Sequence, residues 1–433
     1  MSSSFKSTRP LGEVAKVISG YAFKSAEFGE EGIPIIKIKN IRVGTVDLDD
    51  AAFVDERFLK LDSKYHVNPG DLLISLTGSH PNQPNSVVGR VARMGNHQTR
   101  CLLNQRAGKI CLRKEDAGDL GYLYYVLSSP EFRSAVAMLA NGAASQANVS
   151  PTQVESLEIP LPDLPTQRKI AGILSAYDDL IENNQRRIKI LEEMAQSLYR
   201  EWFVHFRFPG HESARFTASP LGQIPEGWEI SDLEKVTTKI GSGATPRGGK
   251  DSYKTDGISL IRSMNIYDYS FEFDNLAFID PQQAAQLDNV SVEAEDVLLN
   301  ITGASVCRCA MVPSYLLPAR VNQHVAIIRA DTELVDPHFL LDSINSEHNK
   351  RTLFSLAQGG ATREALTKET ICRFPFLLPP RDLIFRYGRI AGAMHAQREC
   401  LQRKNQTLRR TRDLLLPKLL AGDCGVDRAV SAC

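Results

Sequence analysis

The sequence predicts an α+β protein made by tandem duplication, with two β-rich mixed domains that are each followed by a long helix. Three observations predict this architecture: two stretches with heptad spacing, residue pairs that repeat at a constant offset, and a proline-rich segment before each helix. The 433 residues give room for more than one hydrophobic core. A content of 42% hydrophobic and 24% charged residues is that of an ordinary globular protein.

The first long helix is predicted over about residues 166–206. Its apolar positions alternate in steps of four and three residues, which keeps one seam facing a partner helix. No Gly or Pro falls between Ser175 and Phe208, and at about 1.5 Å per residue the helix is about 60 Å long. A polar Asn184 lies in the seam, where such a residue fixes register at some cost in stability. The expected seam positions are Ile170, Leu174, Tyr177, Ile181, Asn184, Ile188, Leu191, Ala195 and Leu198.

A second stretch, later in the chain, repeats this pattern. Its seam positions are Tyr387, Ala391, Met394, Arg398, Leu401, Asn405, Leu408, Arg412 and Leu415. An Asn again lies in the seam. Two heptad stretches of similar length predict an intramolecular helix pair, and two unrelated amphipathic helices are the alternative. The duplication of the segments between them favours the pair.

Short runs rich in Ile, Leu and Val, punctuated by Gly or Pro, predict β-structure before each helix. The runs recur at an offset of 225, which later falls to 218 and then 215, as expected for deletions in loops. The matches are Gly32-Ile33 with Gly257-Ile258, Asn40-Ile41 with Asn265-Ile266, Thr77-Gly78 with Thr302-Gly303, Asn104-Gln105 with Asn322-Gln323, and Pro160 with Pro375.

The duplication predicts the domain boundaries. Residues 1–165 form the first β-rich domain, 166–208 the first helix, 209–228 a linker rich in Pro, Gly and Ser, 229–380 the second domain, 381–425 the second helix and 426–433 a tail. The second proline-rich exit differs from the first, so we expect the second helix to begin differently.

Several classes of protein are not expected. No apolar run approaches the ~20 residues that span a bilayer, and the N-terminal residues lack the apolar core of a signal peptide. The eight Cys are scattered without metal-ligand spacing, so we expect no metal site and a reducing, cytoplasmic setting. No nucleotide-binding loop, HExxH, GxSxG or Asn-Pro-Pro-aromatic motif occurs. An acid-x-Lys pair, Asp62 and Lys64, lacks a recognisable carboxylate partner. We therefore expect a non-enzyme that binds no cofactor itself.

Charge distribution points to DNA, although the formal net charge is zero. No acidic residue lies between Asp71 and Glu115, or between Val297 and Ala330. The basic residues in these stretches are Arg90, Arg93, Arg100, Arg106, Lys109, Arg113, Lys114, Arg308, Arg320 and Arg329. Amides and hydroxyls are interleaved with them, the mixture that reads base edges as well as phosphates. A solvated basic face without a DNA role is the alternative.

The duplication, the two helices and the proline-rich exits together resemble the specificity subunit of type I restriction-modification systems, over about residues 10–425. The segments that carry the resemblance are PGDLLISLTG (69–78), LPDLPTQRKIAGIL (161–174), LIENNQRRIKILEEMAQSLYREWFVHFRFPGHE (180–212) and LRRTRDLLLPKLLAG (408–422).

The resemblance implies a bipartite reader of double-stranded DNA. Each β-rich domain would be a target recognition domain for one half of an asymmetric target. The two helices would pack as an antiparallel coiled-coil spacer that sets the gap. Implied partners are two modification (methyltransferase) subunits and the restriction/translocase subunits, which would use S-adenosylmethionine, ATP and Mg. Apolar positions on the outer faces of the helices are expected to dock these partners. The aromatic segment from Trp202 to Phe208 either docks them too or packs on its own domain.

Residue-level hypotheses follow from the same patterns. The DNA-binding candidates are Arg90, Asn104, Gln105, Arg106, Arg308, Arg320, Asn322 and Gln323. Because the two domains should read different sequences, residues shared by both copies are better explained as structural or phosphate-positioning. Base readers are expected where the copies differ, in residues 79–86 and 247–253, with Ser79, Asn82, Arg247 and Lys250 as candidates. A protein-docking scaffold without DNA readout, and a specificity piece of a system with both activities on one partner chain, are the alternatives.

Overall fold

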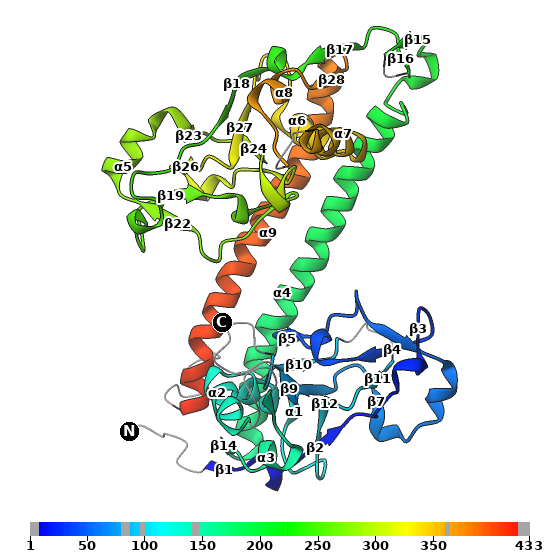
Figure 1. Cartoon of the computed structure of the whole chain (residues 1–433), viewed down its shortest axis with the longest axis vertical. Coiled ribbons are helices and arrows are strands. Elements are labelled where there is room, and N and C mark those ends of the chain that lie inside the picture. Colours follow the sequence, from blue (N-terminus) through cyan, green and yellow to red (C-terminus); the bar gives the residue numbers. More distant parts are fainter. Residues whose placement is uncertain are drawn as a thin grey trace. The chain divides into compact units, whose positions relative to one another are not determined.

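The computed structural model describes residues 8–78, 87–95, 100–140, 147–220, 222–359 and 364–422. The chain forms two compact units (Figure 1). Unit 1 comprises Met1–Glu182 and Gln406–Cys433, and unit 2 comprises Asn183–Asn405. Both boundaries fall within the two long helices, so each helix contributes residues to both units.

Unit 1 contains two five-stranded sheets, with strand orders β2-β12-β8-β10-β5 and β3-β6-β4-β11-β7. The pairs β1–β14 and β13–β9 are separate two-stranded sheets. The strands are β1 (Thr8–Pro10), β2 (Ala15–Ser19), β3 (Phe28–Gly29), β4 (Ile33–Ile36), β5 (Gly44–Thr45), β6 (Ala52–Val54), β7 (His66–Val67), β8 (Leu72–Ser75), β9 (Thr77–Gly78), β10 (Val91–Arg93), β11 (Cys101–Leu103), β12 (Ala107–Leu112), β13 (Ala147–Asn148) and β14 (Glu158–Pro160). The helices α1 (Leu120–Leu127), α2 (Pro130–Leu139) and α3 (Pro151–Glu155) complete the domain.

Unit 2 contains two four-stranded sheets, with strand orders β18-β27-β24-β25 and β22-β19-β26-β23, and the pairs β17–β28, β20–β21 and β15–β16. Its strands are β15 (Phe216–Ser219), β16 (Gly222–Pro225), β17 (Glu229–Asp232), β18 (Thr237–Ser242), β19 (Ile258–Ile261), β20 (Ile266–Tyr267), β21 (Ser270–Phe271), β22 (Ala277–Ile279), β23 (Ser291–Val292), β24 (Val297–Asn300), β25 (Cys309–Met311), β26 (Ala319–Val321), β27 (Val325–Ala330) and β28 (Pro375–Leu378). Its short helices are α5 (Pro281–Gln286), α6 (Pro337–Asn345), α7 (Glu347–Gln358) and α8 (Lys368–Cys372).

Strand register confirms the duplication residue by residue. In unit 1, β11 runs parallel to β4, with Leu103 opposite Ile36. In unit 2, β26 runs parallel to β19, with Val321 opposite Ile261. The central strands β8 and β24 are each buried along their whole length, as their continuous apolar runs predict.

Shared residues occupy constrained points of this common framework. The side chain of Asn40 accepts a hydrogen bond from Lys37 N at 3.0 Å and donates to Asp47 O at 3.0 Å. Asn265 makes the same two bonds, from Arg262 N at 3.1 Å and to Glu272 O at 3.0 Å. The repeated Asn therefore closes the same turn in both copies, which explains why it recurs without any role in binding.

The two long helices are α4 (Leu164–Tyr199) and α9 (Arg381–Ala421) (Figure 1). They pair, as the heptad spacing predicts, and run antiparallel, as the resemblance implies. In unit 2, Asn184 Nδ2 donates to Asn405 Oδ1 at 2.8 Å, and Tyr387 Oη donates to Ala195 O at 3.5 Å. In unit 1, Arg412 forms an ion pair with Asp178. As the residue number rises along α4, the number of the contacting residue in α9 falls, so the two helices run antiparallel.

The expected seam positions are all buried or half-buried in the structure. In unit 1, Ile170, Leu174 and the α9 residue Leu419 share one hydrophobic core with the β-rich domain. In unit 2, Tyr387 and Ala391 belong to the core of the second domain. The helices begin differently, as expected. The side chain of Asp163, the residue before α4, accepts a hydrogen bond from Thr166 N at 2.9 Å, whereas the residue before α9 is Pro380.

The Asn184–Asn405 pair provides a test of how the seam is stabilised. Replacing Asn184 with Ala should lower the free energy of unfolding by about 1–3 kcal/mol, because the buried Asn405 amide oxygen loses its donor. Replacing both residues with Leu should restore or exceed wild-type stability, since two matched apolar groups leave no unsatisfied amide. Urea unfolding of the full chain measures both, with the exposed Gln185→Ala as the control. A neutral Asn184→Ala would contradict this assignment.

The structure adds detail to two segments. Residues 209–228, predicted as a linker, contain the hairpin β15–β16, and the Phe206 ring lies 5.7 Å from that of Phe216. Trp202 and Phe203 are 7% and 4% exposed and pack in the core of unit 2. That segment therefore packs on its own domain, which removes these two aromatic side chains from the expected docking surface.

Among the described residues, none of the helices combines the length and the apolar character that crossing a bilayer requires.

Candidate nucleic-acid interface

A shallow polar groove lies at one corner of the second domain, where several loops leave the strands. It has a volume of about 440 Å³ and is lined by Ser263, Met264, Tyr267, Thr302, Gly303, Ala304, Ser305, Arg308 and His324. Thr302 follows β24, Arg308 precedes β25 and His324 precedes β27. We call this set the unit 2 corner. Its hydroxyls, guanidinium and imidazole are groups that contact phosphates and base edges.

Two contacts order the unit 2 corner. Thr302 Oγ1 lies 2.7 Å from His324 Nδ1. The Arg308 guanidinium lies over the Tyr267 ring, 4.4 Å from its centroid, a cation–π contact that holds the charge at a partly exposed site.

The first domain has an equivalent corner, made by Arg42, Thr77, Arg90 and Arg106. Leu76 N donates to Arg106 O at 3.0 Å, and Ile301 N donates to His324 O at 3.0 Å. These identical bonds make Arg106 the counterpart of His324. By the same criterion Arg90 is the counterpart of Arg308, since Ser75 N donates to Arg90 O at 2.9 Å and Asn300 N to Arg308 O at 2.8 Å. We call this set the unit 1 corner.

Arg42 and Tyr267 were not among the sequence candidates. Each lies two residues after a shared Asn, and the turns that follow are equivalent: Arg42 N donates to Thr45 O at 3.0 Å, and Tyr267 pairs with Ser270 in the β20–β21 ladder. The offset of 225 aligns them, so the repeat itself was the signal that could have found them.

The unit 1 corner concentrates positive charge. Burial and the nearby charges of Arg133 and Arg42 lower the pKa of Arg90 from its ordinary value. Within the part of the chain that the structure describes, the buried Arg90 Nε has no hydrogen-bond partner. A guanidinium with like charges nearby is stabilised by an anionic ligand, so this corner suits a DNA phosphate.

The shared Asn-Gln pairs mark one turn in both domains. Asn104 O accepts from Ala107 N at 2.9 Å, and Asn322 O accepts from Val325 N at 3.1 Å. The Asn322 side chain is buried and accepts from His324 N at 3.2 Å. Gln105 and Gln323 are exposed at the tip of the turn. This placement fits a structural role for the Asn residues and leaves the Gln side chains available to a ligand.

The placement of Arg320 contradicts its choice as a DNA contact. The residue is 7% exposed, and its Nη2 lies 3.1 Å from Asp288 Oδ1. Its other donors bond Ala284 O and Ser291 Oγ at 3.1 Å each. The guanidinium is satisfied inside the domain, so it is a structural cation and we remove it from the interface.

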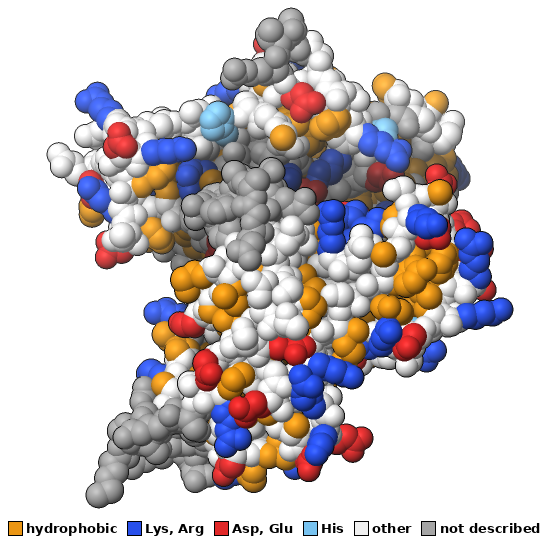
Figure 2. All heavy atoms as spheres, turned by 60° about the horizontal axis from the view of Figure 1, so that its bottom comes forward, with side chains coloured by type: hydrophobic (Ala, Val, Ile, Leu, Met, Phe, Trp, Pro, Cys, Tyr) orange, Lys and Arg blue, Asp and Glu red, His pale blue; other side chains and the backbone are white. Residues whose placement is uncertain are grey.

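The two sequence stretches that lack acidic residues therefore contain more basic residues than the surface exposes as unpaired charges. Lys109 is 7% exposed and pairs with Asp71 at 3.6 Å, while Arg329 pairs with the buried Asp296 at 2.7 Å. These partners lie outside the stretches in sequence but beside them in the sheet. On the face drawn in Figure 2, Lys and Arg side chains are interspersed with Asp and Glu.

The remaining candidates do not join the corners. Arg247 and Lys250 are exposed near the short 3-10 helix Gly249–Ser252, and neither lines the groove. Ser79 and Asn82, with the rest of residues 79–86, lie outside the described residues.

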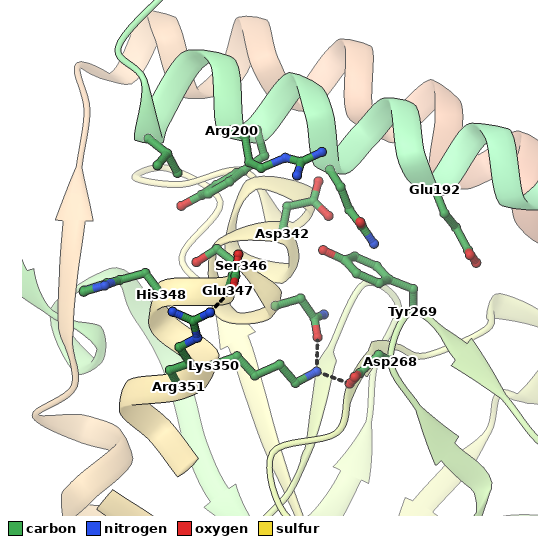
Figure 3. Close-up of a pocket in the computed structure, with 14 residues that line it drawn as sticks. Glu192, Arg200, Asp268, Tyr269, Asp342, Ser346, Glu347, His348, Lys350 and Arg351 are labelled. Atoms are coloured by element: carbon green, nitrogen blue, oxygen red, sulfur yellow. Dashed lines mark hydrogen bonds and ion pairs between the residues drawn. The ribbon is translucent and has the colours of Figure 1, made fainter. Parts of the chain in front are cut away.

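A second hollow in unit 2, of about 470 Å³, lies between α4 and the α6–α7 region (Figure 3). Its charged groups largely pair with one another: Lys350 contacts Asp268 and bonds Asn345 Oδ1 at 3.1 Å, and Arg351 pairs with Glu347. Because these charges are already compensated, the hollow offers little to a charged ligand. In the described part of the chain, His, Cys, Asp and Glu side chains form no group of three that would hold a metal ion.

Comparisons with known proteins agree with this architecture. Residues 4–193 match the family model described as the type I restriction modification DNA specificity domain. The chain is 24% identical over 415 residues to a Methanocaldococcus jannaschii protein named as the MjaX type I specificity subunit, covering 96% of this chain and 92% of that one. Residues 4–193 therefore match this specificity domain, and the chain is similar over nearly its whole length to a protein named as a type I specificity subunit.

Other relatives and one solved structure extend the match. The type I restriction enzyme StySPI specificity subunit of Salmonella potsdam is 23% identical over 387 residues, covering 86% of this chain and 78% of the relative. The crystal structure of the S subunit of the M. genitalium type I restriction-modification system shares the fold, with a TM-score of 0.64 at 15% identity over 95% of both chains. The specificity component of such a system confers sequence recognition and is not itself catalytic.

Proposed function

We propose that this chain reads a two-part asymmetric DNA target, with each β-rich domain contacting one half through its corner. The observation that carries the proposal is the pair of equivalent corners. The same strand ends present Thr77 and Arg90 in one domain and Thr302 and Arg308 in the other, but different neighbours surround them. Two similar readers with different side chains fit a target whose halves differ in sequence.

Shared and differing residues have separate roles in this proposal. Arg90 and Arg308, which occupy the same place in both domains, contact phosphates and set the register of each domain on the duplex. The exposed Gln105 and Gln323 lie beside them at the equivalent turns. The residues that differ between the corners contact base edges.

Partners supply the chemistry. We propose two modification subunits, which methylate adenine with S-adenosylmethionine, and restriction/translocase subunits that use ATP and Mg. Exposed apolar side chains on the long helices are the proposed docking positions. They are Leu180 and Leu414 in unit 1, 51% and 59% exposed, and Ile190, Met194 and Ile390 in unit 2, 54%, 48% and 38% exposed. Apolar residues at such exposure are typical of partner surfaces.

Arg308, assigned above to a phosphate, provides a direct test of the electrostatic part of the proposal. It lines the groove of the unit 2 corner, with its guanidinium over the Tyr267 ring. Replacing it with Ala should weaken binding of the assembled methyltransferase to duplex DNA and reduce the slope of log K against log salt by about 0.9. The uncharged Ser305→Ala in the same groove is the control and should leave the slope unchanged. An unchanged slope for Arg308→Ala would rule out a phosphate contact. Absence of any DNA retention by wild type at moderate salt would favour the scaffold alternative.

A further inference from the structure

The unit 1 corner and the unit 2 corner differ at two positions that both lie next to the shared threonine. In unit 1, Thr77 Oγ1 donates to Asn148 Oδ1 at 2.8 Å. In unit 2, the position opposite Thr302 is Ala365, which has no side-chain acceptor. The pairings Thr77–Asn148 and Thr302–Ala365 are equivalent bridges in the two domains. Thr302 instead contacts His324, and Arg106 occupies that position in unit 1.

The residue paired with each threonine differs between the two corners. This difference determines whether the threonine hydroxyl can contact the side chain at position 106 or 324. The His324 ring is fixed by Thr302 through Nδ1, so one ring nitrogen, Nε2, remains for a ligand. Thr77 is engaged by Asn148, so its hydroxyl is not directed at residue 106. Arg106 is exposed and retains its full fork of N–H donors.

These two side chains recognise different base edges. A guanidinium donates two parallel hydrogen bonds to O6 and N7 of guanine, the commonest specific contact in the major groove. A single imidazole nitrogen makes one contact and does not reproduce that fork. The backbone places both residues at the same point, so the side chain alone makes the difference.

We propose that the position occupied by Arg106 in unit 1 and His324 in unit 2 is a specificity determinant, and that Arg106 reads a guanine in the first half-site. Asn148 and Ala365 are positioning residues, because they decide whether the neighbouring threonine holds the reader. The inference rests on the proposed function, since it requires that the corners face DNA.

The test exchanges the corners between the domains. The full chain is co-expressed with its modification partner, and methylated adenines are mapped across a random-sequence plasmid library. The variants are His324→Arg with Ala365→Asn, which rebuilds the unit 1 corner in unit 2, and the reciprocal Arg106→His with Asn148→Ala. Gln286→Ala in unit 2 and Glu115→Ala in unit 1, at exposed residues outside both corners, are the controls.

The first exchange should impose a preference for guanine of about tenfold or more at one position of one half-site, and leave the other half unchanged. The reciprocal exchange should lose a guanine preference of similar size in the other half. Arg106→Ala should relax the same position without introducing a new preference.

Three outcomes distinguish the possible failures. An unchanged motif in the exchange variants, with methylation retained, would overturn the proposal. A uniform loss of methylation across all sequences, with the complex still assembled, would also overturn it, because position 106/324 would then contact phosphate or serve the fold. Failure of the wild-type chain to direct methylation to any two-part motif would instead refute the proposed function.

Discussion

Replacing Gly243 with Ala should destabilise unit 2 by about 3 kcal/mol or more. A Cβ at this residue would lie 2.1 Å from Val321 O and 2.3 Å from Asn322 O. Both are backbone atoms of the turn that carries Gln323 and His324, so a side-chain rotation relieves nothing. Either the strand that leads into residue 243 or the turn must move, and the unit 2 corner would move with it.

The duplication supplies a second copy of this experiment. Gly20 is the counterpart in unit 1, and its Cβ would lie 2.3 Å from Leu103 O and 2.4 Å from Asn104 O. Gly241 is the matched control, since a Cβ there meets no atom within 4 Å. The same change is thus made at Gly241 within β18 and at two glycines that directly follow a strand, and a Cβ at each of these two would meet backbone carbonyl groups.

Urea unfolding resolves the two units, because both Trp residues, Trp202 and Trp228, belong to unit 2. Gly243→Ala should shift the fluorescence transition to lower urea, whereas Gly20→Ala should shift the circular-dichroism transition with less effect on fluorescence. Gly241→Ala should shift neither by more than about 0.5 kcal/mol. Equal midpoints for Gly243→Ala and Gly241→Ala would contradict the close approach.

Replacing Asp342 with Ala should cost about 3–5 kcal/mol. The carboxylate is 1% exposed, accepts from Tyr387 Oη at 2.6 Å, and lies 3.1 Å from His395 Nε2. Tyr387 and His395 both belong to α9, so this carboxylate attaches the long helix to the second domain. Burial, and then Asp342, raise the pKa of Tyr387 well above its ordinary value.

The large expected loss comes from a buried charge that Asp342 helps to compensate. Burial lowers the pKa of Arg398, and the charges of Glu192 and Asp342 oppose that shift. The Arg398 Nη1 lies 3.9 Å from Glu192 Oε1, and its Nε is buried without a hydrogen-bond partner. Without Asp342 the buried guanidinium is left with Glu192 at 3.9 Å and the weaker effect of Glu399.

Three variants separate the charge from the hydrogen bonds. Asp342→Asn keeps an acceptor for Tyr387 and should lose less stability than Asp342→Ala. Asp342→Ala combined with Arg398→Met should recover part of the loss, because no buried charge is then left uncompensated. Urea unfolding followed by Trp fluorescence measures all three. A loss below about 1 kcal/mol for Asp342→Ala would show that the network does not hold α9 to the domain.

The sequence predicted the long-range organisation well because its signals are periodic. Steps of four and three residues specify a helix seam, and Asn184 and Asn405 meet in it. A constant offset located the duplication because shared residues such as Asn40 and Asn265 close the same turn. Gly32 and Gly257 adopt positive φ of 120° and 127° at equivalent points, where other residues are strained.

The sequence predicted the site less well because charge partners are distant in the chain. Arg320, Lys109 and Arg329 belong to basic runs, yet strand alternation turns them toward Asp288, Asp71 and Asp296. Thr302 contacts His324 and also pairs with Ala365, which lies in a third segment. Local composition carries no information about such three-way contacts.

The measurement that tests the central claim most directly is the methylation map of cells that express this chain with the modification subunit and no other specificity subunit. Methylated adenines at a single interrupted, two-part motif are the predicted result. Replacing the unit 2 corner should alter one part of the motif only. Methylation that is absent, or that is identical with and without this chain, would contradict the account.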